Sequence, residues 1–398
     1  MGRKISRTLR TQLCEMLDIE YPIILAGMGG VSGPTLVAAV SNAGGLGVLG
    51  AAGMNAEQLR DWIKKTRALT DKPFGVDLLL PNIDLPPISG KFSISELKAF
   101  LPAENLAFVD GLKRELGIPD VEIPPLEVDS SFISGMGKLI DVILEEQVPV
   151  FASGLGSPEA IIPRAHAQGM KVIGLVGNVK NARRIANAGA DIIVAQGHEA
   201  GGHTGRIGTL ALVPQVVDAV EPVPVVAAGG VGDGRGVVAS LAMGACGVWV
   251  GTAFILAHEA CVDSPKDWAI NVGVDPYDLE QWEIDHWKDR IIAATEEDTR
   301  VTRIYTGKTA RFVSNKFIEA WEKAGGKTLA MPLQTLLVCE AELGFRKGRM
   351  TDYMGEFGGQ IVGMLKERKS AQQIVDEMVE EAIRILKEKL PAEVVAEG

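Results

Sequence analysis

Two histidines and a glutamate stand among four glycines in the stretch QGHEAGGHTG, residues 196–205, which directly follows the apolar run DIIVA. His198, Glu199 and His203 form the pattern HExxxH, whereas a helical zinc site needs HExxH, with its imidazoles one turn apart. The two glycines before His203 also disfavour a helix, because glycine is costly inside one. The spacing therefore predicts no metal site here.

Glycines beside an imidazole favour a different chemistry. A backbone without Cβ atoms can approach a flat or anionic ligand closely, and an imidazole can accept a proton near neutral pH. We expect His203, which lies between Gly202 and Thr204, to point into such a site. A structural role stays open for both histidines, and it is the favoured interpretation for His198.

Two further glycine-rich stretches, AAGGVGDGRG (227–236) and VGTA (250–253), come later in the chain. Neither contains G-x-G-x-x-G followed by an acidic partner, so a dinucleotide fingerprint is not indicated. The chain also lacks the G-x-S-x-G pattern of a serine nucleophile. Backbone amides after the last two strands of a barrel commonly bind phosphate. The two stretches therefore indicate a phosphorylated cofactor or substrate.

These stretches belong to a repeating unit of an apolar run, a glycine or polar loop, and a helix of small residues. Eight runs have the length and β-branched composition of buried strands: 22–27, 46–50, 74–80, 148–153, 171–176, 191–196, 223–229 and 247–251. Helical patterns lie between them, at 34–44, 56–70, 158–169, 179–190 and 234–245. Eight such units over about 240 residues favour an α/β fold of the (β/α)8 TIM-barrel type over an open sheet. The loops that follow the strands then meet on one face.

Two regions depart from this repeat. Residues 81–147 are too long for one connecting helix, so we expect an insertion after the third strand, with the third barrel helix near 135–147. Residues 263–365 are expected to form a mainly helical substrate or lid region. Its aromatic residues are interpreted as the core of this appendage, with a lid that touches substrate as the alternative: Trp268, Tyr277, Trp282 and Trp287.

The C-terminal residues 366–398 contain a capping box, Ser370 with Gln373, followed by apolar residues on one side of a helix. We expect this helix to pack on the barrel, which is predicted to comprise residues 15–262. The predicted architecture is thus a barrel with an insertion after strand three and a mainly helical C-terminal appendage.

Composition limits the possible partners of the chain. A net charge of −11 over 398 residues argues against binding to nucleic acid or to a membrane surface. Four cysteines that form no CxxC pair indicate a reducing, cytoplasmic setting. The uncharged run 236–257 has the length of a membrane span, but it divides into a small-residue helix, a glycine turn and a β-branched strand. We therefore place it in the barrel.

Several motifs, taken in order, resemble the nitronate monooxygenase (2-nitropropane dioxygenase-like) family, which includes flavin-dependent enoyl-ACP reductases. The resemblance covers about three quarters of the chain, and the stretch around 196–205 is its most specific part. The motifs are LAGMGG (25–30), SNAGGLGVLG (41–50), KPFGVDLLL (72–80), AQGHEAGGHTG (195–205), VVAAGGVGDG (225–234), VWVGTAF (248–254) and GGQIVGM (358–364).

The resemblance implies an FMN-binding TIM barrel, with His203 at the position of the catalytic histidine. It implies that the flavin ring is contacted by residues after the first, third and sixth strands: Ala26, Gly27, Met28, Asp77, Gln196, Gly201 and Gly202. It further implies that the phosphate is held after the last two strands, by Gly229, Gly230, Trp249, Val250, Gly251 and Thr252.

One position departs from the family pattern. The third strand usually reads FGVN, whereas this chain has Asp77 in place of the asparagine. A carboxylate accepts hydrogen bonds but cannot donate them as an amide does. Asp77 is therefore expected either to be protonated or to meet a different edge of the flavin.

The leading functional hypothesis is an FMN-dependent oxidoreductase that oxidises nitronates or similar carbanionic small molecules with O₂, with His203 as proton acceptor. One alternative is an NAD(P)H-dependent FMN reductase of an enoyl thioester or quinone. Another is a non-catalytic flavin-binding protein that docks a partner. A homodimer is a further expectation, and Gln196 slightly favours the monooxygenase hypothesis.

Overall fold

The computed structural model describes residues 8–80, 89–123, 126–129, 132–263 and 280–394. Eight parallel strands form a closed ring, in which successive barrel strands of the chain lie side by side and the last, β11, pairs with the first, β1. They are β1 (Ile23–Leu25), β2 (Gly47–Gly50), β3 (Phe74–Leu80), β6 (Val150–Gly156), β7 (Lys171–Val176), β8 (Ile192–Gln196), β10 (Val225–Ala228) and β11 (Gly247–Val250). A parallel bridge between Ile24 and Leu46 joins the first strand to the second. The predicted TIM barrel is confirmed, with all eight strands.

Helices surround this ring, because each strand presents one apolar face outward. They are α2 (Pro34–Asn42), α3 (Ala56–Leu69), α6 (Phe132–Glu145), α7 (Ile162–His166), α8 (Val179–Asn187), α9 (Thr209–Val220) and α10 (Gly234–Ala242). The uncharged run 236–257 forms α10, β11 and the short α11 (Thr252–Ile255). In the part of the chain that the structure describes, no helix is long and apolar enough to span a bilayer.

The eighth helical position is occupied by a distant segment. α11 has only four residues, and α15 (Ala371–Arg384) packs against both α10 and α2. Its capping box of Ser370 and Gln373 is present. The chain then ends in a π-helical turn (Ile385–Lys389) and α16 (Leu390–Glu393), while α1 (Gln12–Leu17) closes the bottom of the barrel.

Successive side chains along each barrel strand alternate between two hydrophobic cores, one under the helices and one inside the barrel. Outward residues such as Val76 and Ile193 pack under the helices, and inward residues such as Val48, Val194 and Val226 fill the barrel. Successive side chains of a strand point to opposite faces, so the next inward positions can be assigned. At the C-terminal ends they are Ala26, Gly50, Asp77, Gly154, Gln196, Ala228 and Trp249.

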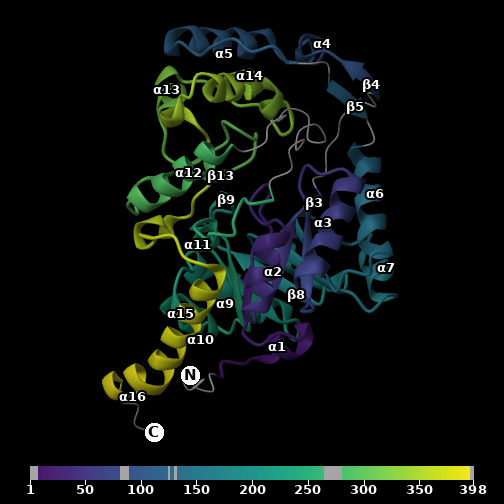
Figure 1. The fold of residues 1–398 in the computed structure, drawn as a ribbon, viewed down its shortest axis with the longest axis vertical. Helices are drawn as coiled ribbons and strands as arrows, with labels where there is room; N and C mark the ends of the chain where they lie inside the picture. The colour runs from purple at the N-terminus through teal and green to yellow at the C-terminus, as the bar shows by residue number, and fades with distance from the viewer. Residues whose placement is uncertain (1–7, 81–88, 124–125, 130–131, 264–279, 395–398) are drawn as a thin grey trace.

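The insertion after β3 leaves the barrel. Its strands β4 (Ser89–Phe92) and β5 (Leu126–Asp129) pair antiparallel, and between them lie α4 (Ile94–Lys98) and α5 (Ala103–Leu116). α5 packs on α14 (Leu333–Lys347), and it shares a hydrophobic core with α13 (Lys316–Ala324). Figure 1 shows α5, α13 and α14 together at the end of the molecule opposite α1.

A small antiparallel sheet connects this upper layer to the barrel. It contains β12 (Thr299–Thr302), β13 (Ala310–Val313) and β9 (Gly202–His203), in that order. The sequence did not predict this sheet within the mainly helical appendage. α12 (Gln281–Ala293) and two 3₁₀ turns, η1 (Thr351–Tyr353) and η2 (Gln360–Met364), complete the region. Trp268 and Tyr277 lie outside the described residues, and the predicted domain boundaries remain predictions.

Candidate active site

Small residues and one carboxyl form the floor of the barrel mouth. A Cβ atom added to Gly27 would lie 2.3 Å from the Asp77 Cβ, and one added to Gly154 would lie 2.8 Å from its Oδ2. A Cβ atom at Gly50 would collide with the backbone of Met28. Because these positions carry no side chain, Asp77 and the backbone of Met28 can pack directly against the neighbouring strand ends.

Asp77 is a buried carboxyl at this floor, with only 5% of its surface exposed. Burial raises its pKa well above the usual value, and the hydrogen bond that Oδ1 accepts from the Gly154 amide, at 2.7 Å, opposes the rise only in part. No ion pair in the described part of the chain involves Asp77. These features favour the protonated alternative, in which the carboxyl keeps a hydrogen to donate.

His203 is held beside the mouth by the small sheet. β9 pairs with β13, which places His203 opposite Ala310. The side-chain amide of Gln196 donates a hydrogen bond of 2.7 Å to the carbonyl oxygen of His203. Burial, together with the smaller effect of the positive charge of Lys308, lowers the pKa of His203 to about 4. The imidazole is therefore neutral at pH 7 and can accept a proton.

The hydroxyl of Thr306 holds the imidazole of His203 in place. Thr306 Oγ1 lies 3.1 Å from His203 Nε2 and 3.2 Å from the carbonyl oxygen of Lys308, and it accepts the amide of Lys308 at 3.3 Å. A hydroxyl both donates and accepts, so this contact suits either tautomer of a neutral imidazole.

His198 and Glu199 shape the loop. His198 Nδ1 lies 2.8 Å from the carbonyl oxygen of Gly205, and its own carbonyl accepts from the Arg311 guanidinium. The Glu199 carboxylate accepts the amide of Thr209 at 2.9 Å, at the start of α9. Among the described residues, no group of three or more His, Cys, Asp or Glu side chains is arranged to hold a metal ion.

The loops after β10 and β11 contact the segment around Gly359, for which the sequence predicted no role. Gly229 and Gly230 both have positive φ values, 90° and 77°, and turn the backbone sharply as β10 ends. The Gly359 amide donates to Thr252 Oγ1 at 3.0 Å, and a Cβ atom on Gly201 would lie 2.8 Å from that amide nitrogen. The signal that could have indicated this contact is the adjacent pair of glycines at 358–359.

The other predicted phosphate residues lie around these loops. Trp249 points into the barrel interior, whereas Val250 points outward into the core under the helices. Gly251 follows, close to Ala26 and Met28. The structure thus brings the predicted residues of the first, third, sixth, seventh and eighth strands to one mouth.

A cleft of about 800 Å³ opens beside His203. It lies between the ends of β6, β7 and β8 and the loop that joins β12 to β13. Its lining comprises Gly154–Gly156, Leu175–Asn178, Asn181, Arg184, Ile185, Gln196, His203–Ile207, Arg303 and Gly307–Thr309. Gln196 and His203 therefore face a space large enough for a small organic molecule.

Comparison with known proteins decides the family. Residues 10–272 match the family model described as nitronate monooxygenase. The chain belongs to the nitronate monooxygenase family. It is an oxidoreductase of that family. A probable nitronate monooxygenase of Staphylococcus aureus is 38% identical over 340 residues, which cover 82% of this chain and 85% of that protein.

Two solved structures resemble this family member over nearly the whole chain. FabK from Thermotoga maritima has a TM-score of 0.71 at 30% identity, and the match covers 97% of this chain and 100% of FabK. A nitroalkane oxidase from Streptomyces ansochromogenes also has a TM-score of 0.71 at 30% identity, covering 94% and 98% of the two chains. The similarity therefore extends beyond the barrel to the upper layer.

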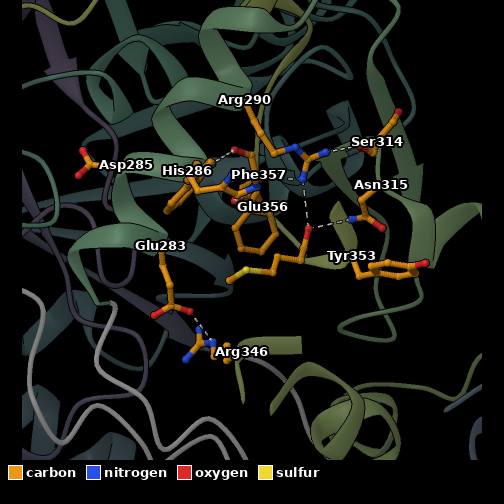
Figure 2. Close-up of polar contacts among 12 residues, drawn as sticks. Glu283, Asp285, His286, Arg290, Ser314, Asn315, Arg346, Tyr353, Glu356 and Phe357 are labelled. Atoms are coloured by element: carbon orange, nitrogen blue, oxygen red, sulfur yellow. Dashed lines mark hydrogen bonds and ion pairs between the residues drawn. The ribbon is translucent and has the colours of Figure 1, made fainter. Parts of the chain in front are cut away.

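In this nitronate monooxygenase-family enzyme, a buried polar cluster anchors the segment that leads to Gly359. Figure 2 shows the Arg290 guanidinium between the Glu356 carboxylate, at 2.8 Å, and the carbonyl of Ser314. His286 Nε2 lies 3.9 Å from the other oxygen of Glu356. Burial raises the pKa of Glu356 to about 7, although Arg290 opposes the rise. The next residue, Phe357, accepts a hydrogen bond from the Trp287 indole at 3.0 Å.

Proposed function

We propose that this protein is an FMN-dependent oxidoreductase that oxidises nitronates, or carbanions formed from acidic C–H compounds, with O₂. The observation that carries the proposal is the neutral imidazole of His203, which faces a cleft of about 800 Å³ at the mouth of the barrel. A cytoplasmic location and a homodimer remain predictions.

The mouth fits a flat, phosphorylated cofactor. The strand ends carry glycine and alanine, such as Ala26 and Gly27, so no large side chain from these positions would block a planar ring, and the raised pKa of Asp77 favours a carboxyl that can donate a hydrogen bond to it. Under this proposal the ring contacts are Ala26, Gly27, Met28, Asp77, Gln196, Gly201 and Gly202. The phosphate contacts are Gly229, Gly230, Trp249, Val250, Gly251 and Thr252. Bound FMN would supply the electron acceptor, which O₂ reoxidises.

His203 would remove the acidic proton of the substrate through its unprotonated ring nitrogen. Its neutral state at pH 7 follows from burial, and its orientation follows from the hydrogen bonds to Gln196 and Thr306. A base held in one orientation loses little freedom when the substrate binds. A nitronate is already deprotonated, so its oxidation does not need this step.

The names of two similar proteins support the same chemistry. The S. aureus relative is called a probable nitronate monooxygenase, and the S. ansochromogenes structure is called a nitroalkane oxidase. Both likenesses cover more than four fifths of this chain.

Anaerobic reduction tests the proposal. Purified protein is loaded with FMN under nitrogen, divided, and mixed with a nitronate, with NADH or with NADPH. Bleaching of the flavin absorbance by the nitronate alone supports the proposal. Bleaching only by NADH or NADPH identifies the reductase alternative. Protein that does not bind FMN, or a bound flavin that no reagent bleaches, overturns the proposed activity.

A further inference from the structure

The cleft beside His203 is lined by cations. Four basic side chains contribute to it: Arg184, Arg206, Arg303 and Lys308. Among the residues that the structure describes, no acidic side chain lines it. This local charge is opposite in sign to the net charge of −11 of the whole chain.

Three of these cations lie in positions where water screens them. Arg184, Arg206 and Arg303 are exposed. Arg184 also lies 3.7 Å from Glu159, and Arg303 donates through Nε to the carbonyl of Gly307. Exposed charges of this kind contribute little to binding energy individually.

Lys308 differs from the other three. Its side chain is half-buried, and burial lowers the pKa of its ammonium group. In the described part of the chain, its Nζ makes no hydrogen bond or ion pair with another residue. It is close enough to His203 for its charge to lower the pKa of the imidazole. A partly desolvated ammonium group without a counterion is unfavourable unless a ligand supplies the negative charge.

The backbone around Lys308 holds it at this place. The loop 303–309 joins β12 to β13, and the Thr306 hydroxyl accepts the amide of Lys308 at 3.3 Å. The carbonyl of Thr309 accepts the amide of Thr204, which follows His203. His203 therefore lies on β9, and Lys308 lies in the loop directly before β13, the strand that pairs with β9.

We propose that Lys308 binds a carboxylate or phosphate group of the substrate, at a point separate from the carbon that His203 deprotonates. This inference rests on the proposed function, because it names an anionic small molecule as the class of substrate for the same cleft. Lys308 is then a specificity-determining residue, and Arg206 and Arg303 at the rim attract the anion through longer-range charge.

Binding of unreactive probes tests this inference without turnover. The FMN-loaded protein is titrated calorimetrically with glutarate, with inorganic phosphate and with uncharged glutaramide. We expect glutarate or phosphate to bind and glutaramide not to bind. Lys308→Met should lower the affinity for the anion by about tenfold or more, as expected when a charged hydrogen bond is lost. Lys308→Arg should restore most of the affinity.

A matched control removes a nearby charge that does not line the cleft. Arg183 is exposed on α8, directly before the cleft residue Arg184. Arg183→Met should bind the anions as the wild type does. Equal anion binding by wild type and Lys308→Met would overturn the inference, as would the absence of anion binding at millimolar concentrations.

Kinetics then distinguish a distant anion from charge at the reacting centre. The nitronate of 4-nitrobutanoate is compared with the nitronate of its methyl ester, which lacks the distal charge. Lys308→Met should raise KM for the carboxylate substrate and leave the ester unchanged. An equal loss of kcat on both substrates would place Lys308 at the reacting centre and overturn the inference. If the anions bind but no nitronate is oxidised, the proposed function fails while Lys308 retains its assigned role.

Discussion

Replacement of Glu356 by glutamine should change how the stability of the protein depends on pH. Burial raises the pKa of this carboxyl from 4.5 to about 7 in the folded state. Each pKa unit corresponds to about 1.4 kcal/mol, so the shift amounts to about 3 kcal/mol. The folded state holds the proton more tightly than the unfolded state, and the stability contributed by Glu356 therefore falls as pH rises from 4.5 through 7.

Glutamine cannot ionise, so the Glu356→Gln variant should lack this contribution. The free energy of unfolding of the variant, relative to wild type, should rise by about 3 kcal/mol between pH 4.5 and pH 8. Urea unfolding at several pH values, followed by tryptophan fluorescence, measures the difference. The groups that face Glu356 are Arg290, His286 and Glu283, and all three remain in the variant.

Glu340 provides a control of opposite sign. Lys98 and Lys113 lie 2.8 and 3.2 Å from its carboxylate, and they lower its pKa although burial opposes them. Its contribution should be present above pH 4.5 and disappear as pH falls. The reasoning is refuted if the Glu356→Gln difference stays constant with pH, or if it follows the same trend as Glu340→Gln.

Three further predictions concern the site. His203→Gln should slow turnover of a nitroalkane by a factor of about 10² to 10⁴, while oxidation of the preformed nitronate is retained. In the wild type, the rate with the nitroalkane should fall only as the pH drops toward about 4, where His203 becomes protonated. Steady-state rates with both substrates measure this, and equal losses on both would contradict the role of His203. Wild type should lose stability relative to Asp77→Asn as pH rises, because the buried carboxyl must ionise. Unfolding midpoints of both proteins at pH 5, 7 and 9 check this. A difference between the two midpoints that stays constant with pH would contradict it. Gly359→Ala should weaken FMN binding by about tenfold, because its Cβ would lie 2.8 Å from the carbonyl oxygen of Glu199. Fluorescence titration measures the affinity for FMN, and an unchanged affinity would contradict this prediction.

Much of the barrel could be predicted from the sequence because its signals are local. A run such as 191–196 is apolar and β-branched, and the helix at 179–187 begins at Asn178, whose side chain accepts the amide of Asn181. Repetition of these units gives the barrel, and a barrel collects its loops on one face. The sequence could therefore predict a candidate site around His203 at the barrel mouth.

Contacts between distant segments could not be predicted in this way. β9 has two residues, too few for a strand signal, and it exists only because β13 lies beside it. Thr306 meets His203 across 103 residues of sequence. α15 fills the eighth helical position because α11 is too short to do so. None of these relations leaves a periodic pattern.

The sequence by itself determined the barrel, its open mouth and the presence of His203 there, because strand alternation and glycine positions follow from local backbone geometry. The tertiary structure decided the protonation of the site. The lowered pKa of His203 and the raised pKa of Asp77 result from burial, and the charge environment of Lys308 depends on which described groups surround it. Desolvation and Coulomb interactions act through space, so only the folded arrangement determines them.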